Sequence, residues 1–186
     1  PIGAQQTSTM TAEFNLDARA PVWNAVTPNT PLTTYGTSLT TYDAQGVAIP
    51  TSFYLQKTGS DTWNMFTDPT SAATAVTSSV GTMTFGTNGL LTSAGTTTLN
   101  VTSPNPAIGA FPVTVDISSV TQYGASFGVS NLTQDGYAPG ELTGLKIGED
   151  GVITARYSNG VTQAAGQLSL ADAIGIPCRD NAIFTN

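Results

Sequence analysis

The feature that most constrains the fold of this chain is a series of tight-turn sequences that separate short extended runs. An Asn-Gly or Asp-Gly pair is a strong signal for a β-hairpin, and such pairs stand at the predicted turns Asn88-Gly89, Asp150-Gly151 and Asn159-Gly160. A fourth, Asp43-Ala44-Gln45-Gly46, opens with Asp and closes with Gly in the same way. A chain that reverses this often leaves little room for long helices, so the sequence predicts an all-β fold.

The composition indicates the same fold class. Thr accounts for about one residue in six, and its branched Cβ favours extended backbone over helix. Charged residues make up only 9% of the 186 residues and hydrophobic residues 39%, so Thr, Ser, Asn and Gln must cover much of the surface. We therefore expect two small β-domains, each a sandwich or a flattened barrel.

Charge and hydropathy exclude two classes of partner. The net charge is −7, and the five basic residues are scattered along the chain, so no basic stripe is present that could bind nucleic acid. No apolar run approaches the roughly 20 residues that a membrane-spanning helix needs. We expect neither a nucleic-acid partner nor a membrane partner.

Cys178 is the only cysteine, which rules out a disulfide within the chain, and we expect it to be a plain small side chain. The sequence starts at Pro1 without the basic and apolar regions of a secretory signal. Either a signal was removed or the chain is a piece of a longer protein, and the second interpretation is favoured.

Extended runs account for most of the chain. Near residue 118 the sequence pattern changes from alternating strands to Gly-rich meanders. Residues 67–79 are left open as a loop or a short helix. The predicted strands cover residues 12–16, 37–42, 47–55, 63–66, 80–85, 90–92, 96–102, 111–117, 142–147, 152–157 and 161–170.

Turn and strand motifs follow one another in a distinctive order after residue 134. They are Asp135-Gly136-Tyr137-Ala138-Pro139-Gly140-Glu141-Leu142, then 150–160 (DGVITARYSNG), then 166–171 (GQLSLA). This order resembles that of the bacterial flagellar hook protein family, and Thr41-Tyr42-Asp43-Ala44-Gln45-Gly46 resembles a hairpin of the same family. The residues that carry the resemblance, all expected to be structural, are Asp135, Gly136, Tyr137, Gly140, Asp150, Gly151, Tyr157, Ser158, Asn159, Gly160, Gly166, Gln167 and Leu168.

The resemblance implies an organisation in which one domain is inserted into another. Residues 12–118 would be the outer domain of the hook protein, and residues 1–11 and 119–186 part of a middle-layer β-domain. Residues 172–186 depart from the family pattern.

The resemblance also implies a function. The protein would be a structural subunit that self-assembles into a curved, flexible tube and transmits torque from motor to filament. Its partners would be other copies of itself, the hook cap, the distal rod and the hook–filament junction proteins. It would be extracellular, in the flagellum, and exported without a cleaved signal peptide.

Catalytic chemistry is not expected. Gly124-Ala125-Ser126-Phe127-Gly128 matches the pattern of a nucleophile elbow, but the chain contains no histidine and so cannot complete a Ser-His-Asp triad. Glu149 and Asp150 are adjacent in a predicted turn, which is a poor geometry for an acid–base pair. One cysteine without histidine makes a zinc site implausible. We predict no catalytic residue, no metal and no cofactor.

Two alternatives remain open. One is another self-assembling β-protein of a cell surface or a phage tail. The other is a carbohydrate-binding or adhesin-like cell-surface β-domain, in which a tryptophan would stack on a sugar ring. Trp63 lies in a strand pattern and is expected in the core, whereas Trp23, among prolines, is the better candidate for an exposed contact.

Overall fold

The computed structural model describes residues 1–23, 32–68 and 79–168. Within these residues the regular structure consists of strands β1–β12 and one short 3-10 helix, η1 (Leu32–Tyr35), which confirms the predicted all-β class. The chain divides into two compact units, one comprising residues 2–140 and the other beginning at Glu141. Each unit is described by itself.

The first sheet is organised around β1 (Thr9–Asp17). One edge of β1 pairs in parallel with β7 at its beginning and with β8 at its end, and its other edge pairs antiparallel with β9. β6 pairs antiparallel with the outer edge of β7. The bounds of these strands are β6 Thr96–Thr102, β7 Ala110–Asp116, β8 Thr121–Tyr123 and β9 Gly128–Gln134.

The second sheet is antiparallel throughout, in the order β2-β3-β4-β5. Its strands follow one another along the chain, as the closely spaced turn sequences predict. Their bounds are β2 Gly36–Tyr42, β3 Ala48–Gly59, β4 Thr62–Phe66 and β5 Gly81–Thr84.

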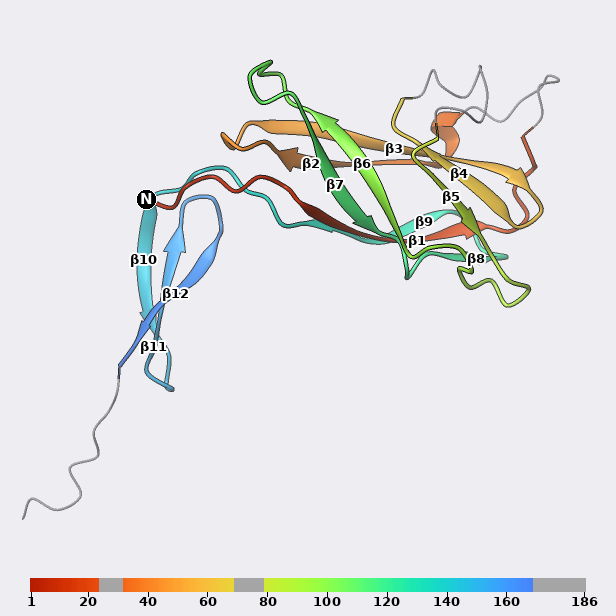
Figure 1. Cartoon of the computed structure of the whole chain (residues 1–186). Helices are drawn as coiled ribbons and strands as arrows, with labels where there is room; N and C mark the ends of the chain where they lie inside the picture. Colours follow the sequence, from red (N-terminus) through yellow and green to blue (C-terminus); the bar gives the residue numbers. More distant parts are fainter. Residues whose placement is uncertain (24–31, 69–78, 169–186) are drawn as a thin grey trace, which may run out of the picture. The chain divides into compact units, whose positions relative to one another are not determined.

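The core lies between these two sheets. β1 buries every second residue, Met10, Ala12, Phe14 and Leu16, as expected for a strand with one face toward the interior. These side chains form one hydrophobic cluster with inward-facing residues of the second sheet such as Trp63. In Figure 1, β2, β3 and β4 lie as one layer above β1, β9 and β8. The arrangement is a β-sandwich.

On each side of the sandwich, the edge of one sheet lies close to the edge of the other. On one side, Thr97 of β6 donates its hydroxyl to the carbonyl of Val80, next to β5, at 2.6 Å. On the other side, β2 lies beside β9. The two sheets therefore approximate a flattened barrel, which agrees with the sandwich or flattened barrel predicted for the first domain. We refer to this body as the barrel.

The chain enters and leaves the barrel as a two-stranded ribbon formed by residues 2–8 and 134–140. Ile2 and Gly140 exchange two backbone hydrogen bonds, as do Gln5 and Tyr137. The two traces run side by side in Figure 1. The ribbon therefore brings together the two ends of a segment of more than 120 residues.

The first unit extends beyond the boundary predicted near residue 118. β8 and β9 follow that position and pair with β1 over Asn15–Asp17 and Met10–Asn15. They were not predicted as strands because they lack a clear alternation of polar and apolar residues. Residues 119–140 therefore fold with the barrel.

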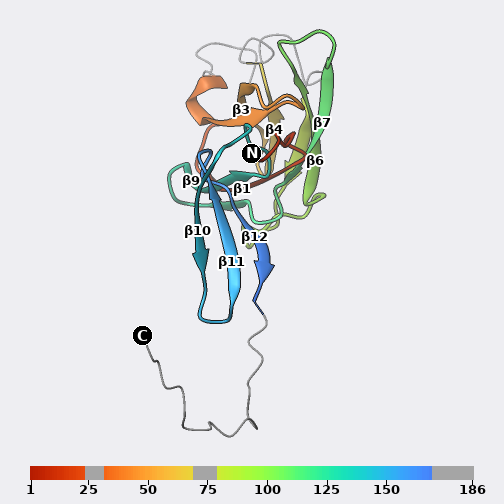
Figure 2. The same cartoon turned by 90° about the vertical axis from the view of Figure 1, so that its left-hand side faces the viewer.

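The second unit is an antiparallel meander of β10 (Leu142–Ile147), β11 (Val152–Tyr157) and β12 (Thr162–Gln167). Figure 2 shows the three strands side by side, and the pairing runs β10-β11-β12. Within the meander Ala155 is buried. Cys178 and the divergent segment 172–186 lie outside the described residues.

Candidate functional site

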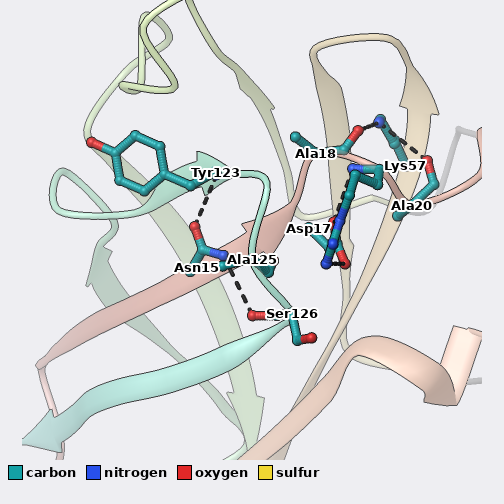
Figure 3. A network of polar contacts seen from close by, with 9 residues as sticks. Asn15, Asp17, Ala18, Ala20, Lys57, Tyr123, Ala125 and Ser126 are labelled. Atoms are coloured by element: carbon teal, nitrogen blue, oxygen red, sulfur yellow. Dashed lines mark hydrogen bonds and ion pairs between the residues drawn. The ribbon is translucent and has the colours of Figure 1, made fainter.

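The sequence that matched a nucleophile elbow has no catalytic context. Ser126 lies in the exposed loop between β8 and β9. Its carbonyl and that of Ala125 accept hydrogen bonds from Nδ2 of Asn15, at 3.4 and 3.0 Å, and Oδ1 of Asn15 accepts one from the Tyr123 amide (Figure 3). The polar groups around Ser126 thus hold the loop to β1.

Asp135, the first residue of the predicted family motif, ties the two strands of the ribbon together. Its Oδ1 accepts hydrogen bonds from the amides of Ser8 and Thr9 at 2.8 and 3.0 Å, and its Oδ2 accepts one from the Ser8 hydroxyl at 2.5 Å. Burial alone would raise the pKa of this carboxyl, but the hydrogen bonds from Ser8 and Thr9 prevail and lower its pKa to about 2. Asp135 is therefore held as a carboxylate.

Gly136 is required by a close approach of the two ribbon strands. A Cβ at this position would lie 2.3 Å from Oγ1 of Thr7 and 2.7 Å from its amide nitrogen. The neighbouring Gln134 accepts hydrogen bonds from the Thr7 hydroxyl at 2.7 Å and from the Gly136 amide at 2.6 Å. A side chain larger than hydrogen at position 136 would push Thr7 out of this arrangement.

Tyr137 and Gly140 complete the ribbon through backbone bonds to Gln5 and Ile2. All four predicted residues of the first motif, Asp135, Gly136, Tyr137 and Gly140, thus lie in one short structure. Their partners on the N-terminal strand of the ribbon carry no sequence signal and were not predicted.

The hairpin between β2 and β3 lies against the ribbon. Gly46, at its tip, has a positive φ of 79°, and a Cβ there would lie 2.6 Å from Cδ of Pro139 and 2.8 Å from Cβ of Ala4. Tyr42 exchanges two hydrogen bonds with Thr7, one from its amide to Oγ1 and one from the Thr7 amide to its carbonyl, both 2.9 Å. Two motifs far apart in the sequence therefore meet at one end of the barrel.

Asp43 organises this hairpin from inside. The residue is fully buried, and its carboxylate accepts hydrogen bonds from the Ser103 hydroxyl at 2.7 Å and from the amides of Gln45 and Val47 at 2.9 and 3.0 Å. The Ser103 hydrogen bond, followed by those from the backbone, lowers the pKa of the Asp43 carboxyl. The hairpin is thereby connected to the loop between β6 and β7.

The predicted motif residues of the meander hold its first turn and its last strand together. Gly151 has a φ of 77°, and a Cβ there would lie 2.7 Å from the carbonyl oxygen of Leu168. The Leu168 amide donates to the Gly151 carbonyl at 2.8 Å, and Nε2 of Gln167 donates to the Asp150 carbonyl at 3.3 Å. Gly166 pairs with Ile153 in the ladder between β11 and β12.

The second turn of the meander contains the other predicted motif residues. Gly160 has a φ of 84°, its amide donates to the Tyr157 carbonyl, and Oδ1 of Asn159 accepts from the Val161 amide. Ser158 exchanges two hydrogen bonds with Glu141, through its amide at 2.8 Å and through its Oγ at 3.0 Å. The hydrogen bonds of these motif residues hold backbone geometry within the meander.

Trp63 lies in the core, as predicted. It is fully buried, and its indole Nε1 donates to Oε1 of Gln122 at 2.7 Å, while Nε2 of Gln122 donates to Oδ1 of Asp61 at 2.9 Å. The other tryptophan, Trp23, is partly exposed, and its amide donates to the carbonyl of Lys57. Of the two tryptophans, only Trp23 could therefore contribute to contacts at the surface.

Lys57 is a buried cation that the sequence analysis did not single out. Its Nζ donates to the carbonyl oxygens of Ala18 and Ala20, at 2.5 and 3.1 Å (Figure 3). The nearby Asp17 forms an ion pair with Arg19 at 2.9 Å, and the hydrogen bond from Arg19 lowers the pKa of Asp17. Lys57 thus fixes the loop that follows β1.

Nowhere in residues 1–23, 32–68 and 79–168 do three or more Asp, Glu, Cys or His residues gather in a way that could hold a metal ion. The same ranges contain no helix of the length and apolar character needed to traverse a membrane.

Comparison with known proteins identifies the family. The family described as "Flagellar basal body protein FlaE D2 domain" matches residues 15–137. The chain is 32% identical over 178 residues to the flagellar hook protein FlgE of Escherichia coli and 33% identical over 180 residues to that of Salmonella typhimurium. Each alignment covers 92% of this chain but only 44% of the relative.

A further relative and a solved structure are also similar to this chain. FlgE of Rhizobium meliloti is 32% identical over 163 residues, covering 85% of this chain and 38% of the relative. The crystal structure of Helicobacter pylori flagellar hook protein FlgE2 aligns with 72% of this chain and 32% of its own, at 18% identity and a TM-score of 0.49. On the family match over residues 15–137, this chain belongs to the flagellar hook protein family.

Proposed function

We propose that this chain is part of a structural subunit of the bacterial flagellar hook, which assembles with other copies of itself into a curved, flexible tube that transmits torque from motor to filament. The observation that carries the proposal is the use of the family motifs. Asp135 and Ser158 direct their side chains to backbone amides of the chain itself. Motifs used in this way specify shape, which is what a subunit of an assembly supplies.

The meander supports a working state in which the chain packs against other polypeptide. Leu142, Leu145 and Ile147 of β10 are 51, 62 and 59% exposed. A small sheet without a covered apolar face has little independent stability. Burial of these three side chains in an assembly would remove a cost that the isolated meander carries.

The low charge of the surface suits contacts that must change during rotation. When a curved tube rotates about its own axis, contacts between subunits lengthen and shorten once in each turn. Interfaces made of Thr, Ser, Asn and Gln offer many similar hydrogen bonds, often through water, and contain no desolvated ion pairs that would fix one register. We propose that the composition of this chain permits such sliding.

The finer assignments follow from the same proposal. The chain would act outside the cell, in the flagellum, after export without a cleaved signal peptide, and would have no enzymatic activity. Its further partners would be the hook cap, the distal rod and the hook–filament junction proteins. The carbohydrate-binding alternative has less support, because one of the two tryptophans, Trp63, is fully buried and cannot stack on a sugar.

A chimaera tests the proposed function. The matching segment of the Escherichia coli hook protein is replaced by residues 2–168 of this chain, and the product is expressed in cells that lack their own hook protein. We expect hooks in electron micrographs and recovery of swimming. The matched control carries Gly136→Val, which forces a side chain into Thr7 and should abolish hooks. A chimaera that is folded and exported but never polymerises would contradict the proposal.

A further inference from the structure

The tip of the β2–β3 hairpin contacts both strands of the ribbon. The backbone of Gly46 approaches so closely that an added Cβ would meet Ala4 on one strand and Pro139 and the Cα of Ala138 on the other, at 2.8, 2.6 and 3.1 Å. In Figure 1 the end of the β2–β3 hairpin lies alongside the ribbon. This contact is a backbone-to-ribbon contact that leaves no room for a side chain.

A second contact joins the same two elements nearer the barrel. The Thr7 amide donates to the Tyr42 carbonyl, and the Tyr42 amide donates to Oγ1 of Thr7. The Thr7 hydroxyl in turn donates a hydrogen bond to Oε1 of Gln134 on the other ribbon strand. The hairpin is therefore attached to the ribbon at two separate places along its length.

The hairpin is itself held from behind by the loop between β6 and β7. Ser103 donates to the buried Asp43 carboxylate, and Nδ2 of Asn105 donates to Oε1 of Gln45 at 3.1 Å. Ribbon, hairpin and loop thus form three layers of the first unit. Bending of the ribbon toward the hairpin would therefore be resisted first by the hairpin and then by the loop.

We propose that the β2–β3 hairpin is a brace that fixes the direction in which the ribbon leaves the barrel. A two-stranded ribbon by itself is marginally stable and strongly twisted, whereas a ribbon supported at two places moves with the barrel as one body. Rearrangement of the barrel relative to the rest of a subunit then takes place beyond Gly140. The mechanical meaning of the brace rests on the proposed hook function, but the stiffness of the ribbon does not.

Hydrogen exchange in the 186-residue chain tests the brace. Gly46→Ala is compared with Gly160→Ala. Gly160 has a similar φ of 84° but nothing within 4 Å of an added Cβ, and it lies outside the ribbon, the hairpin and the β6–β7 loop, so it controls for backbone strain. The reporters are the amides of Gln5, Tyr137 and Gly140, which are bonded across the ribbon. We expect these amides to exchange about tenfold faster in Gly46→Ala than in Gly160→Ala, with the amides of β7 unchanged.

A second variant keeps the test decisive if Gly46→Ala does not fold. Pro139→Ala removes the ring that Gly46 contacts and introduces no clash, and we expect faster exchange of the same three amides by a smaller factor. Unchanged ribbon amides in the variants that fold would overturn the brace. Because the measurement uses the isolated chain, it stands whether or not the chimaera forms hooks, and the two proposals can fail separately.

Discussion

The carboxylate of Asp135 accepts hydrogen bonds from both the amide and the hydroxyl of Ser8, a residue 127 positions earlier in the chain. The two residues face each other across the ribbon, where the chain enters and leaves the barrel. The bond pattern requires an ionised Asp135, since a protonated carboxyl is a weaker acceptor. The closure of the ribbon is therefore coupled to pH.

Asp135→Asn should reduce stability at neutral pH and abolish part of the acid sensitivity. The pKa of Asp135 is about 2 in the folded chain, below its ordinary value of 3.8. A lowered folded-state pKa stabilises the fold above pH 3.8, and this contribution is lost as the pH falls from 3.8 toward 2. After allowance for solvent screening we expect a loss of about 1–2 kcal/mol at neutral pH.

Urea unfolding at neutral pH and near pH 2 measures this difference. The stabilities of the parent and Asp135→Asn should converge at the acid end. Glu149→Gln, an exposed carboxyl in a turn, serves as the control and should parallel the parent throughout. A constant gap between the parent and Asp135→Asn across the pH range would refute the assignment.

Trp63→Phe should lower the melting temperature markedly. The substitution removes the donor to Oε1 of the buried Gln122 and leaves a small void, at a cost of about 2–4 kcal/mol. Trp23→Phe, at a partly exposed position, is the control and should cost much less. It also leaves Trp63 as the only tryptophan, whose fluorescence should then be shifted to the blue and insensitive to aqueous quenchers. Ready quenching of Trp63 would mean that the core is wrongly described.

Lys57→Met should destabilise the loop after β1. The methionine can fill the volume of the lysine stem but cannot donate to the carbonyls of Ala18 and Ala20. Loss of this donor from one part-buried and one buried acceptor costs about 1–3 kcal/mol. Lys146→Met is the matched control at an exposed position, with an expected effect within about 0.5 kcal/mol. Calorimetry decides between them, and equal melting temperatures would be inconsistent with a role for Lys57 in anchoring the loop.

Gly151→Ala should harm the meander more than Gly160→Ala. Both glycines have positive φ values of 77 and 84°, so either substitution introduces strain of about 1 kcal/mol. Only at Gly151 would the new Cβ also meet a backbone atom, the Leu168 carbonyl oxygen. Exchange of the Leu168 amide, which is bonded to Gly151, should therefore accelerate in the first variant alone. Equal acceleration in both would show that Leu168 does not approach the turn.

The sequence predicts the elements whose pattern is local. The bounds predicted for the strands at 96–102, 142–147 and 152–157 agree with β6, β10 and β11, because alternating side chains and Asx-Gly turns define these segments without reference to the rest of the chain. The predicted strand at 90–92 was wrong. Leu90 and Leu91 make only isolated bridges, to Thr121 and Phe85.

Elements that form by pairing with distant residues could not be predicted from the sequence. β9 is a strand because its backbone pairs with β1, as in the pair Phe14 and Val129, and its own side chains follow no clear alternation. The ribbon likewise forms because the backbones of its two strands pair with each other. The turn glycines of the candidate site could be predicted from turn chemistry, but the residues that they approach, such as Pro139 at Gly46, depend on a register that no single sequence reveals.

The approach of Thr97 to Val80 on one side of the barrel, and of β2 to β9 on the other, affects how copies of this chain behave when crowded. An uncovered strand edge is a template for backbone pairing between molecules and a common origin of aggregation. In the part of the barrel that the structure describes, the edge of one sheet lies close to the edge of the other on both sides. This closeness leaves less room for a second chain to add a strand there, so dense packing of barrels would favour side-chain contacts over amyloid-like backbone ladders.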